Sequence, residues 1–436
     1  MKKTLLFLMS LVLTISVQAQ WMIQSPNFPD ESTGVKHISI VNDDIVWISA
    51  YDGSASSEHR QNFSKTIDGG TTWTAGMIDV GSSTVDIAMI TAIDVDKAWA
   101  VGYPNTSGQG GIFHTSDGGV TWARQESASY TAASSFSNVV WMDIDGNGFC
   151  QGDPIDGYYE NYTTNDYGAN WTRVPEANIP TPISGEYGYV GQIYSTANSI
   201  WYTTNKGRIF RSTDKGFNWE AFQSPISDFG SATSSGNIAF SDNNYGLLIN
   251  NTGSVWNTEN GGETWTELNT TGTIFMSGLD FVDGTLFAVA TGAATDNSGS
   301  AWTQDGGITW NVNDGDVDQH TFIALNENHQ GWSGGFTGAD GSGGIYKYNG
   351  TYVKVEEMDA KQNITCFPNP TNNLLQVQSQ EQIKEVRILN FVGQIVNRIQ
   401  GTDAYMTIEM AGLKNGVYFV EVETLNAQHS VKVVKQ

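Results

Sequence analysis

One eight-residue motif recurs along this chain at an almost constant spacing, and this repeat constrains the fold more than any other feature. The copies read TIDGGTTW, TSDGGVTW, TNDYGANW, STDKGFNW, TENGGETW and TQDGGITW. They end at Trp73, Trp122, Trp171, Trp219, Trp265 and Trp310, which are 45 to 49 residues apart. A fixed period of this length is typical of solenoids and propellers, in which each period is one structural unit that packs on its neighbours.

Each period contains the same succession of short alternating strands. In the first period, VKHISIV and DIVWISA are separated by a polar pair, QNFSKTI follows a polar loop, and the glycine turn leads into WTAGMI. This pattern predicts four antiparallel strands in each unit, here called a to d from the inside out. Because sheets of this kind repeated radially form a β-propeller, the fold class is predicted to be all-β.

Seven units are expected in the ring. Six carry the motif, and residues 320–350 add three further strands in HTFIALN, GWSGGFT and GGIYKYNG. The missing outer strand is expected to come from WMIQ at residues 21–24, where a tryptophan leads the segment as it does in the other outer strands. Pairing of the two ends closes a seven-bladed propeller and leaves no open sheet edge around the ring.

The acidic position of the motif is predicted to be architectural. Glycine accepts positive φ in a tight turn, and an Asp carboxylate accepts hydrogen bonds from the amides of its own turn. The alternative, six equivalent sites for calcium or sugar, is disfavoured because calcium needs six to eight converging oxygens and the motif supplies one Asp and one hydroxyl. We therefore assign scaffold roles, and no metal site, to Asp68, Asp117, Asp166, Asp214, Asn260 and Asp305.

The first twenty residues place two lysines before an apolar run and a small-residue ending, which predicts a secretory signal peptide. No later apolar run approaches the ~20 residues of a membrane-spanning helix, so we expect an exported protein without a transmembrane segment. The chain has a net charge of −25; setting aside +2 in residues 1–20 and +1 in residues 361–436 leaves −28 for residues 21–360. Such a surface repels nucleic acid and anionic lipid, which argues against both as partners.

Metal and cofactor motifs are missing from the sequence. Cys150 and Cys366 are far apart and match no zinc, haem or thioredoxin spacing. A long-range disulfide and two unpaired thiols both remain open. The six histidines show no paired spacing, so the sequence predicts neither a metal site nor a cofactor.

The repeated motif resembles the Asp-box, or BNR, repeat over residues 21 to about 355. That family includes sialidases, xyloglucan-degrading enzymes, sortilin-type receptors and a photosystem assembly factor. The resemblance implies a propeller architecture. It does not imply an activity, because one fold carries many functions.

Strand alternation places the c–d turns with the motif on the same rim as the a–b turns, and the b–c and d–a loops on the other rim. The resembled enzymes have their active sites on that second rim, and its loops vary in length here. The richest stretch is CQGDPIDGYYENY, because aromatic faces with carboxylates commonly hold sugars. The alternative is that Asp153-Pro154 and Asp156-Gly157 only form turns. The candidate ligand-binding residues are Arg60, Tyr158, Tyr159, Glu160 and Tyr187.

Two functions remain open. The first is an extracellular binding or adhesion module for a glycan or protein ligand, which we favour because no catalytic set is recognisable. The second is a glycoside hydrolase, which needs two carboxylates ~5 to 9.5 Å apart. Its candidates are Asp153 or Asp156 paired with Glu186 or Asp318.

A sialidase is disfavoured among hydrolases. Resemblance to that family implies three arginines that grip the substrate carboxylate, whereas Arg124 and Arg173 follow motif tryptophans and are expected on the wrong rim. The negative charge also disfavours an anionic substrate. The xyloglucanase family resembles two propellers that face each other, and this chain has one.

The last seventy residues form a separate pattern. LLQVQ, VRILNF, VYFVEV and SVKVV alternate as strands of a small β-sandwich of about seven strands. This module resembles the type A sorting domain of the type IX secretion system of Gram-negative bacteria. The matching residues are Pro368, Asn369, Pro370, Gly393, Gly416, Tyr418, Lys432 and Lys435.

That resemblance implies export through both membranes, the secretion machinery as a partner, removal of the domain, and surface anchoring or release. The alternative is an ordinary carbohydrate-binding or immunoglobulin-like sandwich. We expect a monomer. The predicted domains are a signal peptide (1–20), a propeller (21–355), a linker (356–365) and a sorting domain (366–436).

Overall fold

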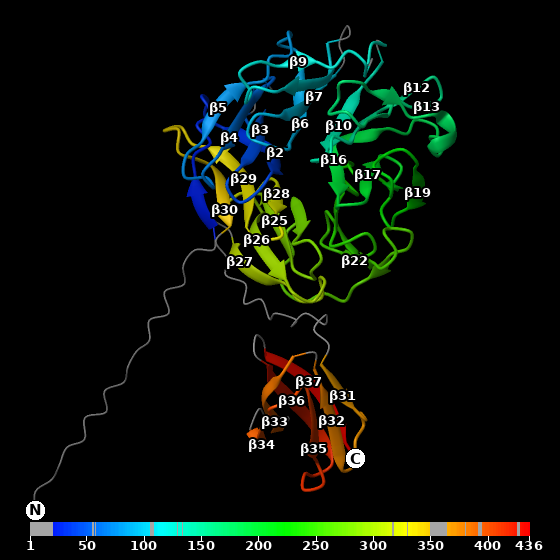
Figure 1. Ribbon diagram of the computed structural model, residues 1–436. Coiled ribbons are helices and arrows are strands. Elements are labelled where there is room, and N and C mark those ends of the chain that lie inside the picture. The colour runs from blue at the N-terminus through cyan, green and yellow to red at the C-terminus, as the bar shows by residue number, and fades with distance from the viewer. Residues whose placement is uncertain are drawn as a thin grey trace, which may run out of the picture. The chain divides into compact units, whose positions relative to one another are not determined.

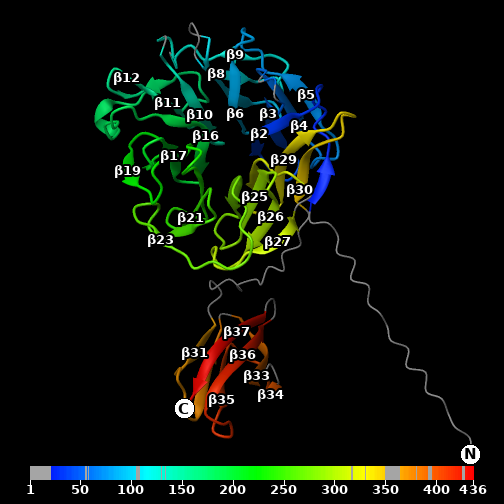
Figure 2. The same cartoon turned by 180° about the vertical axis from the view of Figure 1, so that it is seen from behind.

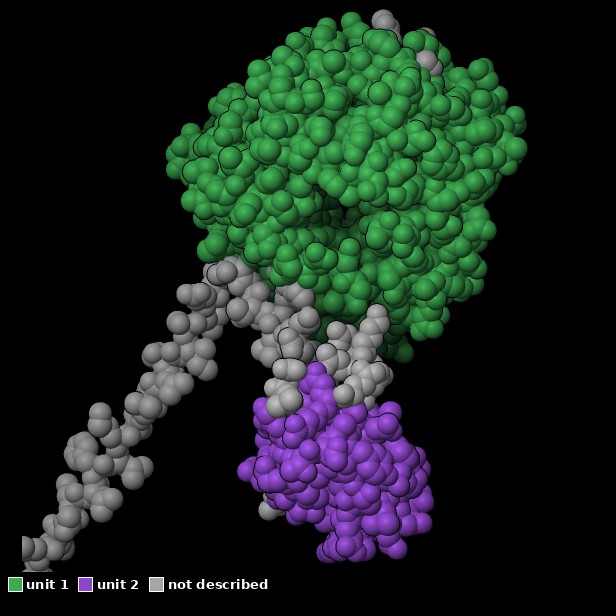
Figure 3. Space-filling model, in the orientation of Figure 1, with its two compact units in different colours: residues 1–351 green, residues 352–436 purple. Residues whose placement is uncertain are grey.

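Alternating apolar and polar residues set the strands of the larger unit, because every second side chain of a strand points to the same face of its sheet. Two compact units divide the chain, Met1–Thr351 and Tyr352–Gln436 (Figure 3). The computed structural model describes residues 21–348 and 364–436, apart from positions 55, 57, 105–108, 129, 133, 316–317, 329, 380, 391–394 and 425–427 and the side chains of 428–430. The predicted signal peptide, the predicted linker up to residue 363, and Gly393 lie outside the described residues.

Seven four-stranded antiparallel blades form a propeller (Figure 1), and the pairing of Gly34 with Phe336 joins blades one and seven into one eight-stranded sheet. Blade one consists of β2 (Thr33–Ile40), β3 (Val46–Asp52), β4 (Asn62–Thr66) and β5 (Thr74–Met77). Blade two consists of β6 (Asp86–Ala92), β7 (Ala98–Tyr103), β8 (Gly111–Thr115) and β9 (Ala123–Arg124). Blade three consists of β10 (Ser137–Met142), β11 (Gly148–Gly152), β14 (Tyr162–Thr164) and β15 (Thr172–Arg173). A hairpin of β12 (Pro154–Ile155) and β13 (Tyr158–Tyr159) is inserted between its second and third strands.

The next three blades continue the ring. A 3₁₀-helix, η2 (Glu176–Asn178), precedes blade four. Blade four consists of β16 (Gly188–Ser195), β17 (Ile200–Thr204), β18 (Arg208–Ser212) and β19 (Glu220–Gln223). Blade five consists of β20 (Gly236–Phe240), β21 (Gly246–Asn250), β22 (Val255–Thr258) and β23 (Thr266–Glu267). Blade six consists of β24 (Gly278–Phe281), β25 (Ala288–Ala294), β26 (Asn297–Thr303) and β27 (Asn311–Gly315).

Blade seven joins the two ends of the propeller, which confirms the predicted seven-bladed ring. It consists of β28 (Ile323–Leu325), β29 (Gly331–Thr337), β30 (Gly343–Tyr348) and β1 (Trp21–Gln24). Strand β1 runs antiparallel to β30, with Trp21 opposite Tyr348 and Gln24 opposite Ile345 (Figure 2). The amino-terminal strand therefore supplies the outer strand of blade seven and closes the ring by joining the two ends of the propeller.

Large aromatic side chains fill the spaces between neighbouring blades. Trp201 of blade four stacks on Phe240 of blade five, with ring centroids 3.9 Å apart, and both are fully buried. Three motif tryptophans, Trp219, Trp265 and Trp310, donate from the indole nitrogen to a glycine carbonyl of their own turn, at 2.9 Å from Trp310 to Gly307. Trp73 and Trp171 donate instead to Gln24 and Gln125 of the neighbouring blade. Burying one such ring stabilises the fold by about 4 kcal/mol as an upper value.

The seven inner strands surround a central channel of about 490 Å³, visible as the hollow in Figure 3. Several of its polar groups are paired with one another or with the surrounding blades. The buried carboxyl of Asp280 accepts hydrogen bonds from the hydroxyl of Tyr194 at 2.7 Å and from the amide of Leu325 at 2.6 Å. Lys36 donates to the hydroxyl of Tyr103 at 2.9 Å.

The smaller unit is a two-sheet β-sandwich. One sheet holds β31 (Thr365–Phe367), β32 (Leu374–Gln378) and β35 (Tyr405–Glu409). The other holds β34 (Ile395–Gln400), β33 (Ile383–Asn390), β36 (Gly416–Thr424) and β37 (Gln428–Lys435). Buried Val377, Ile388, Ile408 and Val420 pack between the sheets. Within the described part of the chain, no helix has the length and apolar character to span a bilayer.

Of the described residues matched to the sorting family, Lys432 and Lys435 lie in β37, and Gly416 and Tyr418 lie in β36, which pairs with it. The side chain of Asn369 donates to the carbonyl of Lys432 at 2.8 Å and accepts from the amide of Val434 at 2.9 Å. The hydroxyl of Tyr418 donates to the carbonyl of Lys414 at 2.8 Å. The Pro-Asn-Pro segment is thereby fastened to β37, so this segment and the carboxyl terminus form one structural feature.

Candidate functional site

The motif carboxylates close their own turns. In blade two, Asp117 Oδ1 accepts from the hydroxyl of Thr115 at 2.8 Å and from the amide of Thr121 at 2.9 Å, while Oδ2 accepts from the Thr121 hydroxyl at 2.6 Å. The hydrogen bonds from Thr121 lower the pKa of Asp117 to about 2. In blade five, Asn260 Oδ1 accepts the equivalent bonds from Thr258 and Thr264, at 2.9 and 3.0 Å. A neutral amide oxygen thus accepts the same bonds as a carboxylate oxygen, so the turn needs an acceptor at this position rather than a charge.

A buried Ser-His-Asp chain lies where the ring closes. His320 Nδ1 is 3.0 Å from the hydroxyl of Ser333, and Nε2 is 2.9 Å from Asp314 Oδ2. Ser300 donates to the other oxygen of Asp314 and accepts from the indole of Trp21 at 2.7 Å. Because His320 and Ser333 are wholly buried, a substrate has no access to them. These bonds hold the amino-terminal strand in the ring.

Two loops on the rim opposite the motif turns enclose a pocket of about 410 Å³. One loop joins the second and third strands of blade three, and the other enters blade four. The lining residues are Asp153, Pro154, Gly157, Pro182, Ile183, Ser184, Gly185, Glu186 and Tyr187. The structure thus brings together Asp153, Glu186 and Tyr187, three of the residues that the sequence suggested.

The hairpin β12–β13 forms one side of this region, and Arg173 holds it in place. The Arg173 guanidinium donates to the carbonyls of Ile155 at 2.9 Å and Tyr158 at 3.1 Å, and lies 3.7 Å from the centroid of the Tyr158 ring. Arg124 likewise donates to the carbonyl of Gly110 in the second b–c loop at 3.0 Å. Both side chains extend along strand d away from the motif turn, so the expectation that they serve the motif rim was wrong.

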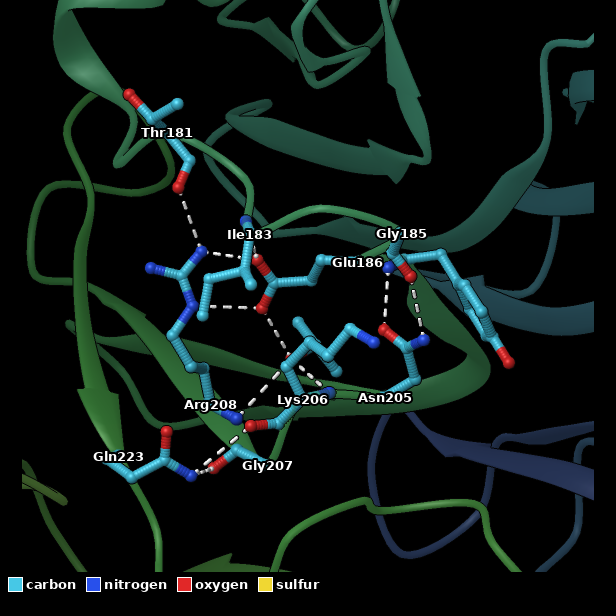
Figure 4. Close-up of polar contacts among 11 residues, drawn as sticks. Thr181, Ile183, Gly185, Glu186, Asn205, Lys206, Gly207, Arg208 and Gln223 are labelled. Carbon is cyan, nitrogen blue, oxygen red and sulfur yellow. Dashed lines mark hydrogen bonds and ion pairs between the residues drawn. The ribbon is translucent and has the colours of Figure 1, made fainter.

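The loop that enters blade four is held by a buried ion pair (Figure 4). Arg208 Nε donates to Glu186 Oε1 at 2.9 Å, and Arg208 Nη2 donates to Oε2 and to the carbonyl of Thr181 at 3.0 Å. The hydroxyl of Thr204 donates to Oε1 at 2.7 Å, and the amide of Ile183 donates to Oε2 at 2.8 Å. The carboxylate of Glu186 therefore accepts four hydrogen bonds and organises the turn around itself.

The two carboxyl groups of the pocket differ in pKa. Burial by itself raises the pKa of Glu186, but the hydrogen bonds from Arg208, Ile183 and Thr204 outweigh it, and the net pKa is lowered. Burial raises the pKa of Asp153 to about 6. Hydrogen bonds to Asp153 Oδ1 from the Asn138 side chain at 2.8 Å and the Gly188 amide at 3.0 Å offset that rise only in part.

The exposed aromatic ring of the pocket belongs to Tyr187. Its side chain is 43% exposed, and its amide donates to Asn205 Oδ1 at 2.8 Å. Asn205 also donates to the carbonyl of Gly185 at 2.9 Å, so the short turn of blade four fixes both ends of this segment (Figure 4). The ring meets Tyr189 edge-on at 5.6 Å. Ile183, which is 46% exposed, is the apolar counterpart of Tyr187 in the lining.

The remaining sequence candidates lie elsewhere or are buried. Tyr159 is fully buried against Tyr202 and Phe210, so it offers no face to a ligand, because alternation along β13 turns it inward where Tyr158 turns outward. Asp156 is exposed at the hairpin tip with a φ of 58°.

Asp318 accepts a hydrogen bond from the hydroxyl of Tyr346 in blade seven at 3.1 Å, and is not among the pocket residues. Glu160 is buried and accepts from the hydroxyl of Tyr162 at 3.2 Å. Arg60 forms ion pairs with Asp30 and with Glu58. Of the carboxylate pairs that the sequence suggested, Asp153 with Glu186 is therefore the one in which both residues line the pocket.

Sequence analysis missed Arg208 and Ile183. Arg208 directly follows the short turn TNKG, and Ile183 is an isolated apolar residue in a polar loop. Neither feature signals a partner until the loop is folded over the turn.

Both cysteines are free thiols, with Cys150 buried and Cys366 partly buried in the other unit. Among the residues that the structure describes, no cluster of three or more acidic, histidine or cysteine side chains is suited to a metal ion.

Comparisons with known proteins agree with this architecture. A family model described as "Secretion system C-terminal sorting domain" matches residues 365–436, and one described as "Photosynthesis system II assembly factor YCF48" matches residues 72–231. The first match confirms the predicted sorting domain. The second confirms the predicted resemblance of the propeller to BNR-repeat proteins. A comparison with curated protein sequences finds no match.

Solved structures share the fold at low sequence identity. "YCF48 bound to D1 peptide" has a TM-score of 0.53 at 18% identity, covering 76% of this chain and 97% of that one. YCF48 from Cyanidioschyzon merolae has a TM-score of 0.52 at 16% identity, covering 76% and 99%. PorZ, described as a bacterial surface component of the type IX secretion system of Porphyromonas gingivalis, has a TM-score of 0.50 at 12% identity, covering 92% and 59%. These likenesses concern the fold.

Proposed function

We propose that this BNR-type propeller, which its type IX sorting domain directs to the cell surface or the extracellular space, is a binding module for a glycan or protein ligand. The ligand site is the pocket between blades three and four. The observation that carries the proposal is that Asp153 and the exposed ring of Tyr187, from different blades, line one pocket of about 410 Å³. Concave sites with a few convergent polar groups are the usual form of binding sites.

The hydrogen bonds of the Glu186 carboxylate favour a binding function over a catalytic one. Both of its carboxylate oxygens accept hydrogen bonds, two of them from Arg208. A nucleophile or general base needs an oxygen that can reach the substrate. Glu186 is therefore better suited to shaping the loop than to attacking a bond. One structural neighbour, YCF48, was solved bound to D1 peptide, which is a precedent for peptide binding by a propeller of this fold.

Tyr187→Ala tests the site. Glycan arrays and pull-downs of extracellular proteins with the mature chain should identify a ligand, and the substitution should weaken its binding about tenfold, because aromatic side chains dominate such contacts. Tyr167→Ala is the matched control, since Tyr167 is 42% exposed but lies in the motif turn of blade three. Equal losses in the two variants, or none in either, would place the ligand elsewhere.

Glycoside hydrolysis is the second candidate, favoured by one observation. Asp153, with its pKa raised to about 6, and Glu186, with its pKa lowered, line the same pocket. Environments that separate the pKa values of two carboxyl groups are a mark of acid–base catalysis. Turnover of a polysaccharide panel that is lost in Asp153→Asn would establish this activity, whereas binding without turnover would leave the first proposal.

A further inference from the structure

One oxygen of the Asp153 carboxylate is left for a ligand. Oδ1 accepts from Asn138 and from the Gly188 amide, whereas Oδ2 has no hydrogen-bond donor among the described residues. The side chain carbonyl of Asn138, which is fully buried, also lacks a donor in the described part of the chain. Asn138 is not among the lining residues, so the free oxygen of Asp153 is the acceptor that the pocket offers to a hydrogen-bond donor, and preferably to a cation.

No cation of the described residues neutralises Asp153. Arg208 is bound to Glu186, and Arg173 is bound to the carbonyls of the hairpin. Lys206 lies in the turn beneath the loop and forms no ion pair among the described residues. The other titratable groups around Asp153 are Asp156, Glu160, Glu186, Tyr187 and Tyr202. All of these are acidic or neutral.

The walls of the pocket fit a long aliphatic stem. Pro154, Pro182 and Ile183 contribute apolar surface, and the Tyr187 ring stands beside them. Lysine and arginine pack their methylene groups along apolar surface while the charged head remains free to pair, and a cation over an aromatic face is attracted to it. A neutral sugar has neither a cation nor a stem of this kind.

The net charge of the propeller also favours a cationic ligand. Residues 21–360 carry a net charge of −28, of which three negative charges belong to the predicted linker, so residues 21–355 carry −25 and attract basic partners while repelling acidic ones. We propose that the pocket between blades three and four takes a lysine or arginine side chain presented by a partner protein. This inference rests on the proposed binding function of that pocket and specifies its ligand class.

The test uses the mature chain and a fluorescein-labelled peptide of repeated Gly-Ser-Lys units. Binding is measured by fluorescence anisotropy in about 0.15 M salt, where the Debye length is about 8 Å, so that distant charges are screened. Acetylation of the lysines should weaken binding at least about tenfold, because it removes the charge that pairs with the carboxylate. This arm requires no protein variant and is independent of folding.

Asp153→Asn should weaken binding of the lysine peptide about tenfold, because it removes the charge and keeps an acceptor for Asn138 and Gly188. Asp156→Asn removes the same charge from the exposed hairpin tip and should change binding less than about twofold. Binding to the unsubstituted chain should weaken between about pH 7 and about pH 5, since the cation requires the ionised form of Asp153. Asp153→Asn should remove that pH dependence.

The outcomes of these tests distinguish a wrong ligand class from a failure of the proposed binding function. Equal weakening by the Asp153 and Asp156 substitutions, or indifference to acetylation, would overturn the cationic ligand. If a neutral xylo-oligosaccharide then binds in a Tyr187-dependent manner, the pocket is a glycan site and only the ligand class is wrong. If no glycan or protein binds in a Tyr187-dependent manner, the proposed function itself fails.

Discussion

Glu186→Gln is the substitution that most directly tests how the pocket is built. Glu186 accepts four hydrogen bonds inside the protein, and its side chain is fully buried. Glutamine can keep Oε1 for Thr204 and for Arg208 Nε. Its amide group then replaces Oε2 and meets two donors, Arg208 Nη2 and the amide of Ile183. The variant therefore loses two bonds and leaves a guanidinium without its counter-charge.

The expected cost is about 3 kcal/mol of unfolding free energy, at the low end for breaking a buried ion pair. We take the low end because the Arg208 side chain is 14% exposed and keeps its bond to the carbonyl of Thr181. For a domain of this size that corresponds to a melting temperature lower by about 5 °C. Exchange of the Ile183 amide should become faster, since its acceptor is lost.

The pH dependence has a definite sign. The pKa of Glu186 is below its usual value of 4.5 in the folded protein. Its contribution to stability is therefore fully present above that value and is lost as the pH falls through the folded pKa. The stability gap between the parent and Glu186→Gln should narrow in acid.

Denaturant unfolding followed by tryptophan fluorescence, with hydrogen exchange at residues 181–188, measures both effects. Glu176→Gln is the control, because Glu176 lies in η2 of the same loop and is exposed. It should change stability by less than about 0.5 kcal/mol. If the two variants behave alike in unfolding and in exchange at Ile183, the ion pair does not hold the loop.

Three further outcomes follow from the fold. Trp21→Ala should lower the unfolding free energy by about 3 kcal/mol, because it leaves a cavity at a buried site where the ring closes. Met22→Ala is the control, because Met22 is 44% exposed, and it should lower the unfolding free energy by less than about 0.5 kcal/mol in the same denaturant measurement. Asp117→Ala should lower the melting temperature but leave ligand affinity unchanged, since its turn lies on the other rim; an affinity loss would contradict the scaffold role. Deleting residues 365–436 should retain the propeller in the periplasm, as cell fractionation would show.

The scaffold was predictable because it is periodic. Each motif turn is closed by hydrogen bonds between its own residues, so every copy needs the same residue types. In blade five, Asn260 replaces the usual Asp and still provides the acceptor oxygen. The amino-terminal strand was predictable for a related reason. Residues 320–350 supply only three strands to blade seven, and Trp21–Gln24 begins with a tryptophan as the other outer strands do.

The site was predictable only in part because it depends on contacts between segments without a period. Asp153, Glu186 and Tyr187 were found by their residue types and loop positions. The partner of Glu186 was not, since Arg208 becomes visible only when the loop folds over the turn of blade four. Tyr159 was misjudged for a local reason, because adjacent residues on a strand face opposite sides, so Tyr158 and Tyr159 cannot both be exposed.

The short turns of blades four and five explain why the pocket lies where it does. A long loop enters each of these blades, and each loop is bonded to the short turn below it, as Asn205 bonds Gly185 and Asn251 bonds Ala232. The two loops are also joined to each other, because the hydroxyl of Tyr189 donates to Asp228 at 2.5 Å. The pocket is thus one end of a continuous loop surface across two blades. A ligand that fills the pocket with one side chain has further surface beside it, which a folded or extended protein segment can cover and a single sugar cannot.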